Sequence, residues 1–335
     1  MISGLIQKLV DRNDLTAEEA HLAMDEMLAG AASEAQMAGF LTALRMKGET
    51  PEELIGFARV MREKAEPFWD GEVLSVLDTC GTGGDRSGTF NISTACAFVV
   101  AGTGIRVAKH GNRSATSRCG SADVMEALGI DIHIPLERLR AAVKDAGIGF
   151  LFAQRFHLSM KHVASVRSQL KLRTVFNILG PLANPAGAKR QVVGVFSPNI
   201  QELMADALAG LGVEHAFVVH GSDGVDEIST AAPTRITEIR SGELRAFMIN
   251  PEDFGIPVAS ISDLHGGEAS TNADIIESIL QGETGPRRDV VLLNSAAAIV
   301  AGGAASSIKE GLRAAADSID SKRALSRLQT LREWK

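Results

Sequence analysis

The run from Asp78 to Gly120 alternates short apolar segments with turns rich in glycine or in cationic residues. The apolar segment 73–77 leads into GTGGD at 81–85, and a helix is expected to start near Ser93. A second apolar segment, 105–108, leads into KHGNR at 109–113. The order predicts strand, glycine turn, helix, strand and cationic turn. In an open α/β sheet, ligands bind where the carboxyl ends of strands meet such turns.

The glycine turn is suited to binding an anion. Glycines let the backbone adopt positive φ and approach a ligand closely, and successive N–H groups of such a turn form a nest for anions. Ser93 or Thr94 could cap the following helix or contact a ligand. The turn is not a dinucleotide fingerprint, because its last required glycine falls on Arg86, and it lacks the Gly-Lys-Ser/Thr of a Walker A loop. The alternative for this pentapeptide alone is an ordinary tight turn.

The distribution of charge favours the anion site. The formal net charge is -7, yet two long windows contain no acidic residue, one between Asp85 and Asp123 and one between Asp145 and Glu202. The cations in these windows are Arg86, Arg106, Lys109, Arg113 and Arg118 in the first, and Arg155, Lys161, Arg167, Lys171, Arg173, Lys189 and Arg190 in the second. Two such windows in an acidic chain suggest one local positive field for a multiply charged anion. Solvated helix faces are the other interpretation.

Composition narrows the class of protein. The chain has 335 residues, 45% hydrophobic and 22% charged, a profile typical of globular proteins of one large or two ordinary domains. No stretch is apolar enough to span a bilayer, and no signal peptide is recognised, so we expect a cytoplasmic protein without a membrane partner. Cys80, Cys96 and Cys119 lack metal-ligand spacing and are expected to be free thiols. The acidic balance argues against nucleic-acid binding.

The order of elements predicts the fold class. The first seventy residues favour short helices, with capping-box spacing at Thr16, Ser33 and Thr50. Their many methionines and leucines are more than so small a unit can bury, so we expect them to pack on the rest of the chain or on another subunit. Strands and helices then alternate, with helical segments expected up to residue 172 and strands at 192–196 and 216–220. We therefore predict a small N-terminal helical domain and a larger α/β domain with a mainly parallel sheet flanked by helices.

Six motifs together resemble one family. They are DTCGTGGD, FNIST, VAKHGNRS, the Arg167-Ser168-Gln169-Leu170 helix, RTVFNILGPLANPA and GSDGVDEIS, and they occur in the order typical of the anthranilate phosphoribosyltransferase family. The resemblance covers nearly the whole chain. The wider superfamily of nucleoside phosphorylases and phosphoribosyltransferases is less similar in these motifs. Cys80 is a departure, because the family more often has an aliphatic residue there.

The resemblance implies an activity and an organisation. The family transfers the phosphoribosyl group of phosphoribosyl pyrophosphate to the amine of anthranilate, releasing pyrophosphate, in tryptophan biosynthesis. It implies dependence on Mg2+ and a homodimer formed through the helical domain. That domain is expected to span 1–72 with a returning segment at about 165–188, and the α/β domain 73–164 and 189–335.

The resemblance also implies site residues. The expected donor contacts are Gly81, Gly84, Asp85, Thr89, Asn91, Ser93, Thr94, Lys109 and Ser121. The expected magnesium ligands are Ser93, Asp226 and Glu227, and the expected anthranilate contacts are Asn112 and Arg167. We assign catalytic roles to Lys109, Arg167 and His110.

The chemistry is compatible with these assignments. Departure of pyrophosphate builds negative charge that backbone amides, Lys109 and magnesium can neutralise. The aromatic amine is neutral at physiological pH and needs no strong base, which agrees with the lack of an evident catalytic triad. Taken singly, Asp226 and Glu227 could be a solvated turn pair and Arg167 a surface arginine. His110 could move a proton or hold the loop.

Two other functions remain open from the residues. A pyrimidine nucleoside phosphorylase would use phosphate and a nucleoside, and would not need magnesium pyrophosphate chemistry. A non-catalytic paralogue could bind nucleic acid through its cationic cleft. The acidic pair at 226–227 and the matches at Asn112 and Arg167 favour the transferase.

Overall fold

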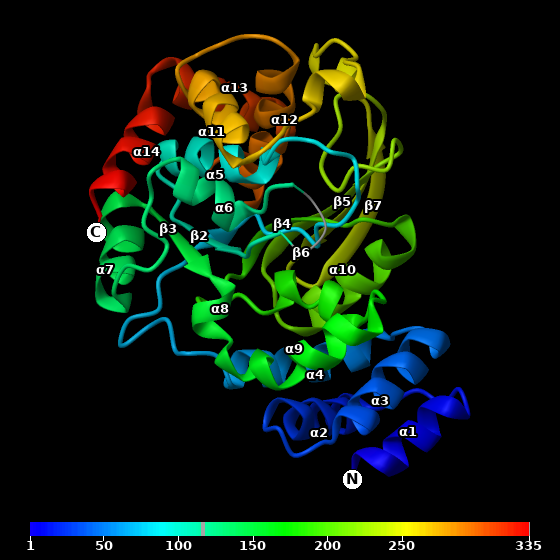
Figure 1. Ribbon diagram of the computed structural model, residues 1–335. Coiled ribbons are helices and arrows are strands. Elements are labelled where there is room, and N and C mark those ends of the chain that lie inside the picture. The colour runs from blue at the N-terminus through cyan, green and yellow to red at the C-terminus, as the bar shows by residue number, and fades with distance from the viewer. Residues whose placement is uncertain (115–117, 335) are drawn as a thin grey trace.

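A computed structural model describes residues 1–114 and 118–334. It contains a seven-stranded sheet in the order β3-β2-β1-β4-β5-β6-β7 (Figure 1). The strands are β1 (Leu77–Asp78), β2 (Val107–Gly111), β3 (Ile148–Phe152), β4 (Arg190–Gly194), β5 (His215–Gly221), β6 (Thr234–Arg240) and β7 (Glu243–Ile249). The first five pair in parallel, and β6 and β7 are antiparallel. The predicted mainly parallel sheet is confirmed.

Helices surround this sheet and form the N-terminal part of the chain (Figure 1). The first four are α1 (Ile2–Val10), α2 (Ala17–Leu28), α3 (Glu34–Lys47) and α4 (Pro51–Glu63). The others are α5 (Ile92–Gly102), α6 (Ser121–Ala127), α7 (Leu136–Ala141), α8 (Ala153–Phe156), α9 (Lys161–Leu170), α10 (Gln201–Gly210), α11 (Ala269–Leu280), α12 (Pro286–Ala301), α13 (Ile308–Asp320) and α14 (Arg323–Glu333).

The alternation of side chains along β5 divides the interior into two main cores. Phe217 and Val219 belong to the core formed with α5, α11, α12 and α13. Ala216 and Val218 belong to the core formed with α10 and the N-terminal helices. Successive side chains of a strand point to opposite faces, so the sheet separates these cores. One face of the sheet is therefore covered by the C-terminal helices and the other by α10 and α1–α4.

The N-terminal helices share their core with the rest of the chain. Met24, Met27, Phe40 and Leu41 are fully buried in the cluster that also contains Val166 of α9 and residues of β4, β5 and α10. The expected packing of these side chains on the remainder of the chain is confirmed. The domain bounds given above stay a prediction.

Local sequence signals explain where the first helices begin. Thr16, Ser33 and Thr50 each form a complete capping box with the residue three positions later, as predicted. Helix α5 begins at Ile92, close to the expected start near Ser93. Ser93 and Thr94 lie inside its first turn and do not cap it, so contact with a ligand is the alternative that stays a prediction for them. The predicted continuation of the helical segment to residue 172 is wrong. Helix α9 ends at Leu170, because Lys171 has a positive φ of 50°.

Glu53 connects helix α4 to the segment before α2 and to the end of α3. Its buried carboxylate accepts hydrogen bonds from the backbone N–H groups of Leu15 (2.9 Å) and Thr50 (2.8 Å). Lys47 pairs with it at 3.0 Å. A buried carboxylate is stable only with such partners, and removing it leaves buried donors and a buried ammonium group unpaired.

We expect Glu53→Ala to lower the free energy of unfolding by about 3 kcal/mol, since it breaks a buried ion pair. Urea unfolding followed by circular dichroism measures this change. The control is Glu52→Ala at the neighbouring exposed position, expected to cost under about 0.5 kcal/mol. Equal effects of the two substitutions would contradict the role of Glu53.

Candidate active site

The candidate site lies at the carboxyl ends of β1, β2, β4 and β5. Gly83 and Gly84 in the turn after β1 have φ of 63° and 82°, which is the conformation glycine favours. A Cβ at Gly81 would lie 2.9 Å from the carbonyl oxygen of Gly194, at the end of β4. A Cβ at Gly194 would lie 1.5 Å from the carbonyl oxygen of Asp226. Three backbone segments therefore meet at distances that only glycine permits.

Three carboxyl groups converge at this meeting point. The backbone N–H of Asp226 donates to Oδ2 of Asp85 at 3.2 Å. Oε1 of Glu227 accepts from the backbone N–H of Ser93 at 3.1 Å, at the start of α5. The adjacent carboxylates thus converge on the glycine turn from the loop after β5. Asp226 and Glu227 are both half-buried, which favours a site over a fully solvated turn.

The environment of these groups disfavours their negative charge. Burial raises the pKa of Asp226 well above its ordinary value, and repulsion from Asp85 and Glu227 adds to this effect. Burial is the main reason that the pKa of Glu227 rises to about 8. The negative charge of Asp85 also raises this pKa, whereas the positive charge of Lys109 lowers it. A cluster of half-buried carboxyl groups with too little positive charge nearby is what a bound divalent cation would stabilise.

Lys109 brings a positive charge into the same place. Its side chain is 2% exposed, and its ammonium group donates to the carbonyl oxygen and hydroxyl of Thr79 at 3.2 and 3.0 Å. It also donates to Oγ of Ser93 at 3.3 Å. Lys109 therefore joins the middle of β2 to the end of β1 and to the first turn of α5.

The polar residues around α5 complete one wall. Oδ1 of Asn91 accepts from Asn272 at 2.9 Å, and its amide group donates to the carbonyl oxygen of Cys119 at 3.4 Å. The hydroxyl of Thr94 is buried without a hydrogen-bond partner among the described residues. Thr89 lies at the rim, bridged to His265 and 3.1 Å from the hydroxyl of Ser87.

The two residues expected to contact the acceptor lie on different elements and have different neighbours. The carbonyl oxygen of Asn112 accepts from Oγ of Ser121 at 3.3 Å, and its side-chain oxygen accepts from Gln154 at 3.3 Å. Arg167 lies on α9 with its guanidinium 5.1 Å from the ring centroid of Phe176, and burial lowers its pKa. Among the described residues, Arg167 makes no hydrogen bond or ion pair with the carboxyl groups or with Lys109.

Arg173 provides a link that sequence reasoning missed. It follows α9, donates to the carbonyl oxygen of Gly84, and places its guanidinium 4.1 Å from the ring centroid of Phe196. The segment that carries Arg167 therefore touches the glycine turn directly. In the sequence Arg173 is only one cation of an acid-free window, and no local signal distinguishes it from the others.

His110 has a buried, hydrogen-bonded ring. Its Nδ1 lies 3.1 Å from the carbonyl oxygen of Gly180, so Nδ1 carries the proton, and Nε2 is buried without a partner among the described residues. Burial lowers the pKa of His110 to about 3, and neighbouring His157 adds to the effect. A ring with so low a pKa is a weak base. The geometry therefore favours holding the loop over moving a proton.

The turn after η4 (Gly180–Leu182) is also part of the site's support. Asn184 donates to Oδ2 of Asp78 at 2.7 Å, and Oδ1 of Asp78 accepts from the backbone N–H of His110 at 3.1 Å. Asp78, Cys80 and His110 have possible metal-ligating atoms within 4.8 Å of one another. Both oxygens of Asp78 already accept hydrogen bonds, so this group is a structural support. Cys80 and Cys96 are free thiols, as expected.

The class of protein follows from comparison with known families. Residues 3–65 match the helical bundle domain of a glycosyl transferase family, and residues 74–325 match its a/b domain. The chain therefore belongs to this glycosyl transferase family. Among the described residues, no helix is long and apolar enough to cross a membrane.

Individual relatives narrow the class. Anthranilate phosphoribosyltransferase of Solibacter usitatus is 52% identical over 98% of this chain and 97% of its own. The anthranilate phosphoribosyltransferase of Methanosphaerula palustris is 51% identical over 99% of this chain and 98% of its own. The crystal structure of the Thermus thermophilus enzyme has a TM-score of 0.91, 43% identity, and coverage of 98% of both chains. The Saccharomyces cerevisiae enzyme, in complex with phosphoribosyl pyrophosphate and Mg, has a TM-score of 0.89 and 28% identity over 99% and 97% of the chains.

Within the glycosyl transferases, the chain belongs to the anthranilate phosphoribosyltransferases. The predicted family, fold and enzyme class are confirmed. The roles of individual residues stay predictions, which the geometry described above supports to different degrees.

The buried histidines predict a loss of stability in acid. Burial lowers the pKa of His157 from 6.5 to about 4, so between these values the unfolded chain binds a proton that the folded chain excludes. Folding stability attributable to this residue is therefore complete above pH 6.5 and is lost as the pH falls toward 4. We expect His157→Gln to remove about 2–3 kcal/mol of the decline in the free energy of unfolding between pH 7 and pH 4.5.

Urea unfolding at the two pH values measures this slope. The control, His133→Gln, replaces an exposed histidine and is expected to leave the slope unchanged. A His157→Gln slope equal to that of the unmodified protein would show that His157 is protonated in the folded state.

Proposed function

We propose that this chain transfers the phosphoribosyl group of phosphoribosyl pyrophosphate to the amine of anthranilate, and that the donor binds at the carboxyl ends of β1, β2, β4 and β5. The observation that carries this proposal is the convergence of Asp85, Asp226 and Glu227 with Ser93 and Lys109 beside a glycine turn. A pyrophosphate with its divalent ion needs both kinds of charge in one place.

The residues present fit magnesium. The half-buried carboxyl groups described above, whose negative charge has little compensation, match the preference of Mg2+ for carboxylate and hydroxyl oxygens. Asp226, Glu227 and the hydroxyl of Ser93 would hold the ion, and Asp85 lies close enough to assist. When bound, the ion would neutralise charge on the pyrophosphate.

The remaining donor contacts come from the backbone and from buried polar groups. The amides of Gly81, Gly84 and neighbouring residues form the nest, and the hydroxyl of Thr94, unpartnered among the described residues, is available to a ligand. Lys109 supplies a fixed ammonium group next to Ser93. These groups are already held in place before the donor binds, so little reorganisation is needed. Asn91, Thr89 and Ser121 complete the proposed donor contacts.

Chemistry at the sugar needs little from the protein beyond position and charge. The lone pair of the acceptor amine forms the new N–C bond, and the C–O bond to pyrophosphate breaks, leaving its electron pair on the pyrophosphate oxygen. The amine then loses a proton to water or to pyrophosphate. We place Arg167 on the acceptor carboxylate and Asn112 beside it. His110 acts through its neutral ring, which holds the loop to Gly180.

The assembly and location are also proposed. A homodimer through the helical part is supported by exposed apolar side chains there, since Val10 is 60% and Met46 70% exposed. The buried methionines no longer support it, because they pack inside the chain. A cytoplasmic enzyme without nucleic-acid or membrane partners agrees with the net charge of -7.

The acidic pair gives the first test. We expect the double substitution Asp226→Asn with Glu227→Gln to lower kcat/KM by at least about 100-fold at limiting magnesium and to raise the magnesium concentration needed for half-maximal activity. Phosphoribosyl anthranilate formation is followed by fluorescence across a magnesium titration. Glu243→Gln, at an exposed acid in β7, is the control. Magnesium dependence like that of the unmodified enzyme would remove the pair from the metal site.

Arg167 gives the second test. Arg167→Ala should raise KM for anthranilate about 10- to 100-fold, because it removes a charged hydrogen bond to the carboxylate, while KM for the donor changes little. The control is Arg59→Ala, at an exposed position of α4. Equal increases in both KM values would count against the assignment.

Activity assays together with a gel-retardation assay separate the other two candidate functions from the transferase. A pyrimidine nucleoside phosphorylase would instead consume a nucleoside with phosphate and would be indifferent to anthranilate. A nucleic-acid-binding paralogue would retard a labelled oligonucleotide in a gel and form no phosphoribosyl anthranilate. Release of pyrophosphate that depends on anthranilate supports the transferase alone.

A further inference from the structure

A polar cavity lies at the opposite ends of the strands from the candidate site. Its volume is about 720 Å³. Arg190 and His215 line it from the first positions of β4 and β5, and Arg240 from the last position of antiparallel β6. The candidate site lies at the other ends of β4 and β5, beyond Gly194 and Gly221. The cavity is therefore separated from that site by the length of the strands.

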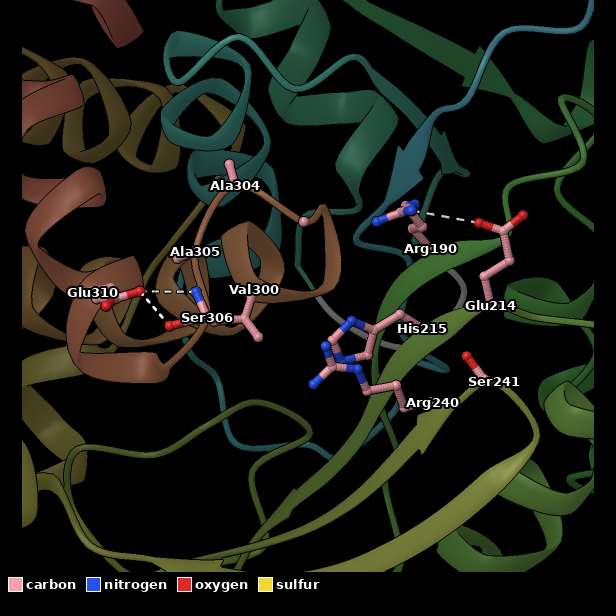
Figure 2. Close-up of a pocket in the computed structure, with 11 residues that line it drawn as sticks. Arg190, Glu214, His215, Arg240, Ser241, Val300, Ala304, Ala305, Ser306 and Glu310 are labelled. Carbon is pink, nitrogen blue, oxygen red and sulfur yellow. Dashed lines mark hydrogen bonds and ion pairs between the residues drawn. The ribbon is translucent and has the colours of Figure 1, made fainter.

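Cationic groups are gathered on one wall of the cavity. Figure 2 shows Arg240 beside His215, and the two residues are direct partners in the β5–β6 ladder. Directly opposed residues of an antiparallel pair place their side chains on the same face. Arg190 lies on the adjacent strand, where it donates to the carbonyl oxygen of Ala301 at 3.0 Å.

The acidic groups of the cavity are already paired with other partners. Glu214 lies 3.5 Å from Arg190, and Glu310 accepts from the backbone N–H and hydroxyl of Ser306 at 2.9 and 2.6 Å (Figure 2). Glu238, behind His215, lies 2.9 Å from its Nε2. Each of these carboxylates therefore already has a partner other than Arg240.

Arg240 is left without a partner. Within residues 1–114 and 118–334, its guanidinium forms no hydrogen bond or ion pair. Nε of Arg190 is also buried with no hydrogen-bond partner in this part of the chain. The pKa of His215 lies below its ordinary value, mainly through burial, and the charges of Arg240 and Arg190 contribute while Glu238 opposes them. On this wall, Arg240 therefore carries a positive charge that no carboxylate of the described residues pairs with, whereas Arg190 already pairs with Glu214.

We propose that this cavity binds a small oxyanion, a phosphate or a carboxylate, with Arg240 as its principal contact and Arg190 and His215 beside it. A planar guanidinium offers paired donors that match two oxygens of such a group. Ser241 adds a hydroxyl group to the lining. This site goes beyond the proposed transferase reaction and does not depend on it.

The ring of His215 reports binding locally. Inorganic phosphate and malonate are titrated separately into the full-length protein, and the 1H–13C signal of the His215 imidazole, assigned with His215→Gln, is followed by NMR. Potassium chloride at matched ionic strength corrects for screening. Phosphate bound at the candidate active site would shift the signal of His110 instead, so the two sites are read separately.

The proposal expects a saturable shift of His215 with at least one of the two anions. Arg240→Gln should weaken that binding at least about 10-fold, and Arg240→Lys, which keeps the charge but loses the paired donors, should weaken it less. Arg245→Gln, on the neighbouring strand outside the cavity, is the control and should bind as the unmodified protein does.

Saturation with phosphate or with malonate identifies which oxyanion the cavity takes. The proposal is overturned if neither anion gives a saturable shift beyond that of chloride, or if Arg240→Gln binds as tightly as the unmodified protein. Arg240 is exposed, and circular dichroism spectra confirm that each variant is folded before it is titrated.

Discussion

The repulsion among Asp85, Asp226 and Glu227 is the constraint on which the candidate active site depends. Partial burial shields Asp226 and Glu227 from water, and Lys109 brings opposite charge close to Glu227. Such a cluster opposes folding unless a cation joins it. The surrounding fold holds the cluster together through two backbone hydrogen bonds and the contacts of Gly81 and Gly194. The repulsion among these carboxylates therefore lowers the stability of the folded protein at this place, and a bound cation would remove the repulsion.

The sheet explains how residues far apart in the chain reach this place. Parallel strands β1, β2, β4 and β5 deliver the glycine turn, Lys109, Gly194 and the acidic loop to one edge. Asn294 of α12 donates to and accepts from the backbone of Ile228, which fixes the loop immediately after Glu227. On the other side, Arg173 connects the acceptor segment to the glycine turn. Two separate supports thus place the proposed metal-binding and acceptor-binding parts.

The sequence predicted much of this arrangement for local reasons. Capping boxes at Thr16, Ser33 and Thr50 have fixed spacing, and the alternation of strands and helices has its own period, so both were found without the structure. The glycine turn and the acid-free windows indicated an anion site. The roles of Asp226, Glu227 and Arg167 came only from family motifs, since each residue alone also fits a solvent-exposed position.

Long-range contacts could not be predicted in this way. Asn184 contacts Asp78 across more than a hundred positions, and nothing in its own segment identifies that partner. Arg173 differs from neighbouring cations only in what lies opposite it. The spacing of Cys80 gave no sign that its sulfur would lie beside Asp78 and His110. Such contacts are set by how elements cross, which the local pattern does not encode.

The shared interior described for the N-terminal helices has a consequence for heat and denaturant. Met24 and Phe40 belong to the same apolar cluster as Val193 of β4 and Val218 of β5. Exposing one side of such an interface exposes the other, so the two parts should lose structure in a single cooperative transition. A fragment ending after α4 would carry a large uncovered apolar face and should associate with itself in water.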